Sequence, residues 1–414
     1  MTNSRKTPSR SSTSAKRRVQ RLLDNPPSQE SIRAEVQLVV DNGNIGVFRE
    51  LGTKDQARFL EIVDQATPAV LVEDTQFVVT LGDIFSDILL LPISTGLLQG
   101  LKKRGDIAVA SGGTTDIWRG VWGDNPVALK AFRIYPLQDL QEAKKILWKR
   151  APIWKRLTHE NVLPFHGVDT SIFQLALIYE WGHNGNIMHY LKSHPDASRP
   201  ELLLQVAKGL QYLHSLEIVH GNLKGANVLI SKSGKAQVCD YDLSPVMSNP
   251  IFTIAATPGV AGSSRWLAPE IIDPPRKTGS KPLAASKPAD VFAFAMLAVE
   301  VFTGNVPFGN MRNELAVIHI AHGKRPTKPQ AVEQLGLTAE MWKFIEKCWN
   351  ANANKRPTID EVVGTWEGFV NGDNNRSSIS KAPGRHSPLV EPHTTHKEKH
   401  GGFLMRRKRF CCLF

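Results

Sequence analysis

Hydrophobic side chains follow a helical spacing in the first part of this chain of 414 residues. Between residues 31 and 103 the apolar positions recur every three to four residues, and Ala57, Leu60, Ile62 and Val63 fall near one face of such a helix. The pattern predicts a small helical region that packs on whatever follows it.

The spacing changes at residue 107. Short apolar runs, separated by Gly and charged turns, predict three strands at residues 107–110, 117–122 and 127–132. Beyond Gly182 the helical spacing returns. The clearest helices are predicted at residues 201–216, 289–303, 338–349 and 359–370. We therefore expect an α+β fold in which a small β-rich lobe is followed by a large helical lobe, with the lobes meeting near Gly182.

Polar segments flank these elements. Residues 1–30 are rich in Ser, Arg and Lys, and residues 372–414 are rich in Gly, Pro and His. Such compositions predict disorder. The expected organisation is therefore a disordered basic tail over 1–30, a helical region over 31–104, an α+β domain over 105–371 and a disordered linker and tail over 372–414.

The composition shows that the positive charge of the chain is concentrated at its two ends. Apolar residues make up 41% of the chain, which excludes a wholly disordered protein. Residues 1–33 carry eight Lys or Arg against two Asp or Glu, and residues 372–414 carry nine against three, so the two ends hold the whole net charge of +12. The tails lack interleaved aromatic residues and the remainder is neutral, which argues against specific nucleic-acid binding.

The four cysteines are Cys239, Cys348, Cys411 and Cys412. They are too sparse for a disulfide framework and have no metal-ligand spacing, so a reducing, cytosolic setting fits best. The N-terminus has no apolar segment of the kind found in secretory signals, and the longest apolar stretch, residues 88–98, is too short to span a bilayer.

Six short motifs then occur in one order. On a strand, Ala128 and Lys130 share a face, so a small side chain can lie over a base while the lysine reaches its phosphates. Taken alone, this Val-Ala-Leu-Lys run is more often a core strand that ends in a surface lysine. The other five motifs are His220-Gly-Asn-Leu-Lys-Gly-Ala-Asn227, Asp240-Tyr-Asp242, Ala268-Pro-Glu270, Asp290-Val-Phe292 and Arg356-Pro357.

This ordered set resembles the protein kinases, and within them the tyrosine-kinase-like serine/threonine group of the kind abundant in mushroom-forming fungi. The resemblance covers residues 105–371 and implies a bilobal protein-kinase fold. It also implies ATP as a possible ligand and Mg²⁺ as a possible cofactor.

The resemblance implies a role for each matching residue. Lys130 matches the lysine that holds the α- and β-phosphates and pairs with a glutamate of helix αC, and Lys224 matches a lysine that steadies the transferred phosphate. Asn227 and Asp240 match the Mg²⁺ ligands. The other nucleotide-binding positions implied are Gly112, Ala128, the gatekeeper Tyr179, and the hinge from Glu180 to Gly182.

Three further matches are structural. Glu270 and Arg356 match an ion pair that braces the large lobe, and Asp290 matches an aspartate that organises the catalytic loop from below.

The departures from the family pattern are more informative. Asn222 stands where the catalytic-base aspartate is expected. An amide cannot take up the proton of a substrate hydroxyl, and general bases contribute about 10²–10⁴-fold in rate. Phosphoryl transfer also relies on positioning and charge stabilisation, so a low residual activity stays conceivable.

The glycine-rich loop and helix αC depart as well. Ala110 and Thr115 replace two of the three loop glycines, and only Gly112 remains. Arg150 stands at the position of the αC glutamate, where it is expected to repel Lys130. Pro152, in mid-helix, should cost about 3 kcal/mol unless the helix kinks there, so we expect a distorted or displaced αC that cannot form the active ion pair. Glu142, two turns upstream, is expected to be out of reach.

Two smaller departures concern Asp242, which replaces a glycine of the metal loop, and Gly221, which replaces an arginine that binds an activation-loop phosphate. Asp242 is either a tolerated substitution or an extra carboxylate that helps to bind a cation or raises a pKa. Gly221 argues against activation by phosphorylation through that contact.

The last four residues, from Cys411 to Phe414, form a CaaX box, and a terminal Phe favours geranylgeranylation. One lipid anchors weakly, and the basic run Arg406–Arg409 supplies a second signal at about 1 kcal/mol per residue. Cys412 is an alternative site of acylation. The four histidines between residues 386 and 400 are expected to be solvated linker residues and not a metal site.

The basic N-terminus is ambiguous. Its composition suits a nuclear or mitochondrial address, but prenylation argues against import, so a second membrane contact or a solvated tail is favoured. The sequence as a whole predicts a membrane-tethered pseudokinase at the cytoplasmic face, or otherwise in the cytosol, that acts as a signalling scaffold or allosteric partner of other proteins. The alternative is a weakly active ATP-dependent serine/threonine kinase, and nucleic-acid binding is the weakest reading.

Overall fold

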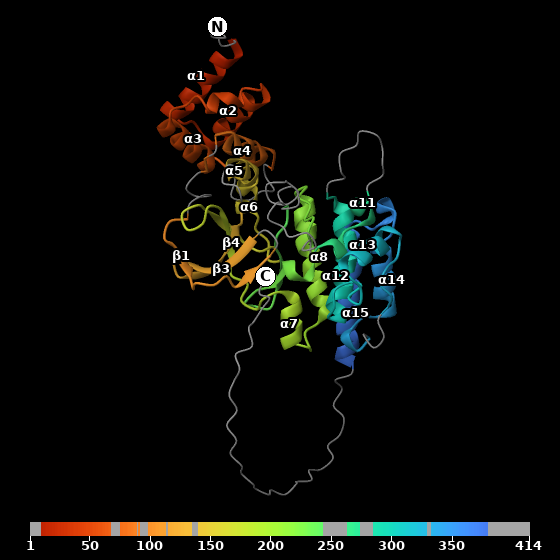
Figure 1. Ribbon diagram of the computed structural model, residues 1–414. Helices are drawn as coiled ribbons and strands as arrows, with labels where there is room; N and C mark the ends of the chain where they lie inside the picture. Colours follow the sequence, from red (N-terminus) through yellow and green to blue (C-terminus); the bar gives the residue numbers. More distant parts are fainter. Residues whose placement is uncertain are drawn as a thin grey trace, which may run out of the picture.

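The computed structural model describes residues 10–67, 75–88, 90–91, 98–112, 115–134, 140–242, 263–273, 285–328 and 333–379. A group of helices at the N-terminus meets α5 and α6 beside a small β-sheet, and a larger helical part follows (Figure 1). The predicted α+β fold, with a β-rich small lobe and a helical large lobe, is confirmed.

The N-terminal group consists of α1 (Arg10–Asp24), α2 (Gln29–Asp41), the 3₁₀ helix η1 (Ile45–Phe48), α3 (Thr53–Gln65) and α4 (Thr75–Ile88). The prediction for α3 was half right. Leu60 and Val63 are buried, but Ala57 is exposed and Phe59 is buried instead, stacked on Phe48 with ring centroids 4.7 Å apart.

Helix α1 corrects the prediction of a disordered tail over residues 1–30. Ala15, Val19, Leu22 and Leu23 recur at intervals of four and three residues and are buried, while the charged residues lie on the other faces. Arg18 donates to Glu35 of α2 at 2.6 Å. The basic composition concealed an amphipathic helix, because four apolar residues suffice to pack it.

The small lobe is an antiparallel sheet in the order β1-β3-β4-β6-β5, with β2 paired to β3. Its strands are β1 (Leu101–Arg104), β2 (Ala110–Ser111), β3 (Thr115–Trp122), β4 (Asn125–Phe132), β5 (Phe165–Asp169) and β6 (Ala176–Glu180). The sequence did not predict β1, which was assigned to the helical region. It is an edge strand whose last three residues are exposed and basic, so it carries little hydrophobic pattern.

The segment predicted as αC is two helices, α5 (Leu140–Trp148) and α6 (Ala151–Arg156). Pro152 stands in the first turn of α6, where its missing N–H costs nothing. The expected kink is therefore a full break, and Arg150 lies at the junction as the N-cap of α6.

Helix α4 packs against both halves of this broken helix (Figure 1). Gly82 allows the close approach, because a Cβ atom there would lie 2.0 Å from the Lys149 carbonyl oxygen. Two ion pairs also join the N-terminal helices to the broken helix: Asp83 of α4 with Lys149 at 2.5 Å, and Asp64 of α3 with Arg156 at 2.8 Å. The N-terminal helices share one hydrophobic core with the lobes that follow.

The large lobe is built around α12 (Lys287–Thr303), in which every residue from Ala289 to Phe302 is buried. Its other helices are α7 (Ile187–Ser193), α8 (Arg199–Ser215), α11 (Pro269–Ile272), α13 (Asn313–Ala321), α14 (Ala339–Cys348) and α15 (Ile359–Ile379), with the 3₁₀ turns η4 (Gly225–Asn227), η5 (Ser264–Trp266), η6 (Glu333–Leu335) and η7 (Ala353–Lys355). A two-stranded sheet, β7 (Val228–Ile230) and β8 (Ala236–Val238), faces the small lobe.

The C-terminal boundary also needs a correction, because α15 continues to Ile379 and the predicted linker began at residue 372. Cys411, Cys412, the run Arg406–Arg409 and the four histidines lie outside the described residues. Within the part that the structure describes, no helix is both long and apolar enough to cross a bilayer.

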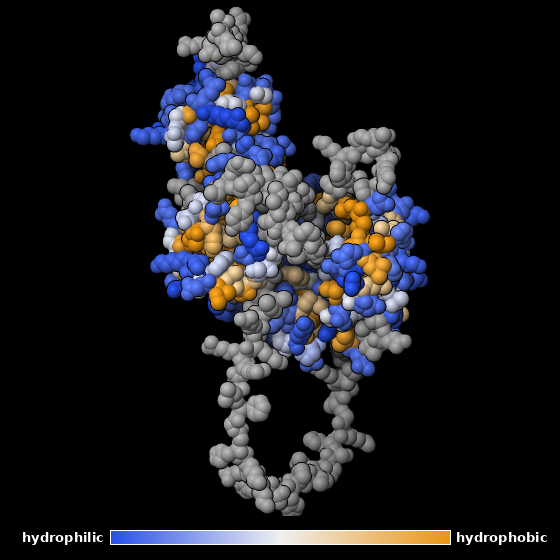
Figure 2. Space-filling model, in the orientation of Figure 1, coloured by the Kyte–Doolittle hydropathy of each residue, from blue (hydrophilic) through white to orange (hydrophobic). Residues whose placement is uncertain are grey.

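Figure 2 shows a largely hydrophilic surface over the N-terminal helices and more apolar side chains over the two lobes. Two large apolar side chains of α13, Leu315 and Ile318, have 46% and 51% of their surfaces exposed.

Candidate functional site

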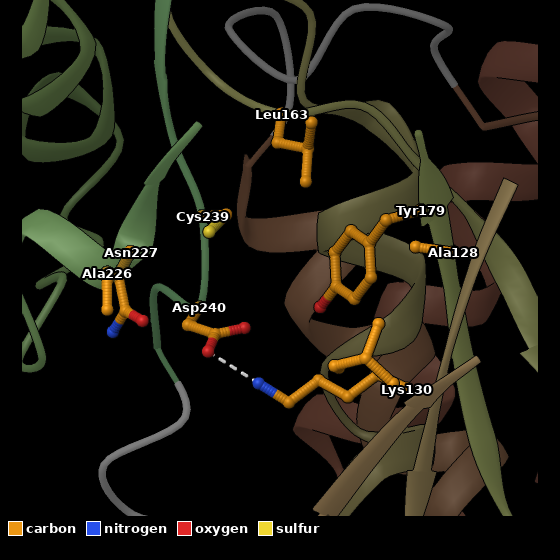
Figure 3. A pocket seen from close by; sticks show the side chains of 9 residues that line it. Ala128, Lys130, Leu163, Tyr179, Ala226, Asn227, Cys239 and Asp240 are labelled. Carbon is orange, nitrogen blue, oxygen red and sulfur yellow. Dashed lines mark ion pairs between the residues drawn. The ribbon is translucent and has the colours of Figure 1, made fainter. Parts of the chain in front are cut away.

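A cavity lies between the small sheet and the β7–β8 segment of the large lobe (Figure 3). It brings together five predicted site residues from four separate segments of the chain. The residues that line it are Ile117, Ala128, Lys130, Leu163, Tyr179, Ala226, Asn227, Cys239 and Asp240.

Lys130 and Asp240 form an ion pair across this cavity. Ala128 and Lys130 both face it, as the period of a strand predicts, and β4 is held in register between β3 and β6. The distance from Lys130 Nζ to Asp240 Oδ2 is 2.5 Å (Figure 3). The partner of this lysine is thus a carboxylate of the predicted metal loop, and not one from the broken helix.

The backbone of the metal loop is left-handed at two aspartates. Asp240 has φ of 61° and Asp242 has φ of 55°. The family pattern places glycine at the second position, where a positive φ costs least, and Asp is one of the few other residues that tolerates it. The conformation expected of the glycine is therefore kept here by Asp242.

Arg150 is the partner of Asp242. Its Nε lies 3.3 Å from Asp242 Oδ2, which is an ion pair and not a well-aligned hydrogen bond, and its Nη1 donates to the Ile146 carbonyl. Burial raises the pKa of Asp242, and the charge of Arg150 opposes that rise. The extra carboxylate therefore pairs with a cation from the broken helix. We had expected this arginine to repel Lys130, and its ion pair is with Asp242.

Glu142 was expected to be out of reach of Lys130. It pairs with Lys145 at 3.2 Å, and both side chains are about half exposed. Among the described residues of α5 and α6, the ion pairs include no carboxylate for Lys130.

Asn222 sits at the centre of a hydrogen-bonded chain. Its side-chain oxygen accepts a bond of 2.8 Å from Ser263 Oγ, and its backbone carbonyl accepts one of 2.7 Å from the Asn227 amide. Lys224 Nζ in turn donates to Ser263 Oγ at 2.7 Å. The predicted residues Asn222, Lys224 and Asn227 are therefore brought together, with Ser263 as a member that the sequence analysis missed.

Burial lowers the pKa of Lys224, and the nearby carboxylate of Asp240 opposes that effect. A lysine in this setting offers a partly desolvated ammonium group to a phosphate. The signal that could have found Ser263 was weak: it stands three residues before Trp266 in a run of small polar residues.

Asp290 organises the loop that carries Asn222. Its carboxylate accepts from the backbone N–H groups of His220 at 2.7 Å and Gly221 at 2.8 Å, and it contacts His214 Nε2 at 2.8 Å. Gly221 has φ of 70°, a conformation that suits glycine better than the arginine usual in the family. These contacts agree with the bracing position implied for Asp290.

Glu270 and Arg356 form a bidentate pair with distances of 2.7 and 2.8 Å. A second buried carboxylate, Glu300, was not predicted. It accepts from the Gly225 backbone N–H at 2.9 Å and from the Trp266 indole at 3.0 Å, and burial raises its pKa to about 7. It thereby ties the loop that carries Lys224 to helix α12.

The predicted phosphate loop is the turn between β2 and β3. Ala110 pairs with Ile117, and Gly112 N–H donates to the Thr115 carbonyl at 2.8 Å. Arg133 closes this turn, because its guanidinium donates to the Gly112 carbonyl at 2.7 Å and pairs with Asp116 at 2.9 Å. Residues 113 and 114, at the tip, lie outside the described residues.

Tyr179 lines the cavity, and in Figure 3 its hydroxyl points towards Lys130. Burial raises its pKa well above the usual range, so the side chain stays neutral. Glu180 and Gly182 follow it in the connection between the lobes, but neither lines the cavity itself. At Gly182 a Cβ atom would lie 3.0 Å from the Leu229 side chain, so the glycine lets the connection pass close to β7.

The residues present fit a nucleotide. An apolar slot, formed by Ile117, Ala128 and Leu163, leads to the ammonium group of Lys130. They also offer two oxygens to a divalent cation, one from Asp240 and one from Asn227, whose amide nitrogen is already committed to Asn222. Among the described residues, His, Cys, Asp and Glu form no cluster of three that could hold a metal ion.

A model of the family described as "Protein tyrosine and serine/threonine kinase" matches residues 106–365, more than half of the chain. This family generally binds ATP and Mg²⁺. The match covers both lobes and every cavity residue named above.

Three curated relatives from Arabidopsis thaliana are similar to this chain. The identity is 27% over 308 residues with serine/threonine-protein kinase STY17, covering 73% of this chain and 47% of that kinase. With serine/threonine-protein kinase VIK it is 30% over 267 residues, covering 62% and 57%. With serine/threonine/tyrosine-protein kinase HT1 it is 28% over 268 residues, covering 63% and 64%. The match thus spans about half the length of the first two relatives.

Proposed function

Because this chain belongs to the protein kinase family, we propose that it is a pseudokinase, tethered to the cytoplasmic face of a membrane, that acts as a signalling scaffold or allosteric partner and can hold ATP. The scaffold role requires a folded and regulated kinase domain, but not rapid phosphate transfer.

The observation that carries this proposal is the state of Asn222. An aspartate at this position would take up the proton of the substrate hydroxyl. The amide has no group that can do so at physiological pH, and its oxygen already accepts the hydroxyl of Ser263 at 2.8 Å. What it can still offer to a substrate is an N–H donor.

The ion pairs around Lys130 support the same conclusion. In active kinases, the Lys–Glu pair to helix αC and the aspartate that binds Mg²⁺ must both be in place. Here Lys130 is bound to Asp240 at 2.5 Å, and Arg150 occupies the place expected for the glutamate. The pairing that accompanies catalysis in the family is thus replaced by a different one.

Nucleotide binding is proposed because the cavity persists, with Lys130 in its lining, and because Lys224 is also retained. Ala128 and Tyr179 line the slot, Lys130 and Lys224 supply ammonium groups, and Asp240 with Asn227 could hold Mg²⁺. Glu180, Gly182 and Gly112 are proposed to contribute backbone contacts, as their positions in the family pattern imply.

Membrane tethering is proposed from the sequence of the C-terminus alone. Prenylation of Cys411 would give one weak anchor, and Arg406–Arg409 would add electrostatic attraction to anionic lipids. The test is to fractionate cells that express the full chain, its Cys411→Ser variant and a Cys412→Ser control. Loss of membrane association is expected for Cys411→Ser alone. Equal loss in both variants would point to acylation, and no loss in either would refute the anchor.

A weakly active serine/threonine kinase is the second candidate. The observation in its favour is the intact chain from Lys224 through Ser263 to Asn222, with Asn227 and Asp240 close by. Positioning of this kind supports some phosphate transfer even without a base.

One experiment separates the two. Transfer of labelled phosphate from ATP with Mg²⁺ is measured for the wild type, Lys130→Ala and Asn222→Asp, with a generic protein substrate. If the wild type transfers no phosphate and Asn222→Asp does not restore transfer, the result supports the pseudokinase. Transfer by the wild type that depends on Lys130 would overturn it in favour of the weak kinase.

A further inference from the structure

We propose that the cavity binds ATP as the free polyphosphate, without a divalent cation, because its own side chains supply the positive charge that the metal brings in active kinases. The inference rests on the proposed nucleotide binding. It concerns only how the phosphates are neutralised, and it holds whether or not phosphate is transferred.

The net charge of the site is more positive than the family pattern implies. In the family, the two lysines, the αC glutamate, the catalytic aspartate and the metal-loop aspartate give a net charge of −1. The corresponding residues here, together with the extra aspartate, give +1; they are Lys130, Lys224, Arg150, Asn222, Asp240 and Asp242. The difference of two positive charges equals the charge of one Mg²⁺ ion.

Two carboxylates of the family pattern are missing from this site: the catalytic aspartate and the αC glutamate. Asn222 removes one charge from the floor of the site. Arg150 removes another and brings a positive charge, which the buried Asp242 balances at 3.3 Å. This neutral pair leaves Lys130 and Lys224 as the cations nearest the place expected for the phosphates, against the single carboxylate of Asp240.

Asp240 itself already forms an ion pair with Lys130. Its Oδ2 lies 2.5 Å from Lys130 Nζ, and both side chains are largely buried, with 20% and 11% of their surfaces exposed. A divalent ion would have to compete with that ammonium group for its one charged ligand. The second possible ligand, Asn227, is a neutral amide held by its contact with Asn222 at 2.7 Å. Two such ligands are few for Mg²⁺, which otherwise relies on carboxylates and phosphates.

The test is equilibrium binding of ATP to the full chain by titration calorimetry, once with Mg²⁺ and once with EDTA. Adenosine serves as a probe without phosphates. We expect ATP to bind with EDTA at least as tightly as with Mg²⁺, and adenosine to bind more weakly. Lys130→Ala and Lys224→Ala should each weaken the binding in EDTA about tenfold or more, because each removes a charge-assisted contact. Lys232→Ala is the control, since Lys232 is exposed and outside the cavity.

A second variant keeps the test decisive if Lys130→Ala fails to fold. Asn222→Asp is nearly isosteric and restores one carboxylate, so it should weaken binding of ATP in EDTA and make Mg²⁺ favourable. Binding that is tighter with Mg²⁺ than with EDTA in the wild type, beyond the error of the titration, would overturn the inference, and so would the absence of ATP binding under both conditions. Absence of binding would also refute the proposed nucleotide binding, whereas a preference for Mg²⁺ would leave it standing; the loss of catalysis is decided separately by the phosphate-transfer assay.

Discussion

Arg150 Nε lies 3.3 Å from Asp242 Oδ2, so the arginine at the expected αC glutamate position is paired with the aspartate at the expected metal-loop glycine position. Each residue alone is a departure from the family pattern at a position needed for catalysis. Together they form an ion pair in which the helix supplies the positive charge and the metal loop the negative one. In the family, the helix supplies the negative charge, a glutamate that pairs with the lysine of the sheet.

This pairing predicts energetic coupling. Arg150→Ala leaves a largely buried carboxylate without its cation, and Asp242→Asn leaves the arginine without its anion while keeping a residue that tolerates positive φ. Each variant should lose about 2 kcal/mol of unfolding free energy, discounted from fully buried pairs because both side chains are about one-fifth exposed.

The double variant is the informative one. It should lose about 1–2 kcal/mol less than the sum of the two single losses, as expected of residues in contact. Urea denaturation of all four proteins measures this. Losses that add to within about 0.5 kcal/mol would show that the two residues do not stabilise each other.

Glu300 should make stability depend on pH. Its pKa in the folded protein is about 7 against an ordinary value of 4.5, so the folded state binds a proton more tightly than the unfolded state. The free energy of unfolding should therefore be highest below pH 4.5 as far as this group is concerned, and should fall as the pH rises from about 4.5 to about 7, by at most on the order of 3 kcal/mol.

Glu300→Gln tests this directly. The amide oxygen can still accept from Gly225 and Trp266, but it does not titrate. The variant should lose this part of the pH dependence between pH 4.5 and 7, measured by chemical denaturation at several pH values. An unchanged slope would assign the dependence to other groups.

The Glu270–Arg356 pair should be worth far more than a surface pair. Arg356→Ala leaves Glu270 mostly buried without a partner, and the expected loss is about 3–5 kcal/mol. Lys208→Ala breaks a more exposed pair with Glu367 at 2.7 Å and should cost less than about 1 kcal/mol. Thermal unfolding of the two variants compares them, and equal shifts would contradict the bracing role.

Gly82→Ala should destabilise the packing of α4 on α5. The added Cβ would meet the Lys149 carbonyl oxygen, and overpacking of this kind typically costs about 1–3 kcal/mol. Gly364→Ala is the matched control in helix α15, because its Cβ would meet no atom within 4 Å and should stabilise the helix by about 1 kcal/mol. Opposite shifts of the melting temperature are expected. A stabilising Gly82→Ala would show that the contact is loose.

The sequence predicted the two-lobed fold because its motifs stand in a fixed order on strongly patterned elements. Lys130, Asn227 and Asp240 could be placed together through that order alone. Helix α1 was missed because its basic residues outweigh Ala15, Val19 and two leucines in any measure of composition, although these four pack it against the core.

The pairing of charges could not be predicted. Arg150 was expected to repel Lys130. A sequence gives the position of a side chain along a helix, but it does not show which loop that side chain contacts. The break at Pro152 and the left-handed turn at Asp242 together decide that contact. Ser263 and Glu300 were missed for a related reason: both act through hydrogen bonds across the fold to residues at least 34 positions away.

The packing of α4 on the broken helix has a practical consequence for dissecting this protein. Phe77, Leu81, Ile84 and Phe85 of α4 are at most 2% exposed, and they belong to the same core as Leu147 and Trp154. A fragment that starts at residue 106, where the family match begins, would leave an apolar strip of α5 and α6 open to water. Such a fragment should be prone to aggregate, so helices α1 to α4 are better regarded as part of the kinase domain's folding unit than as a separable neighbour.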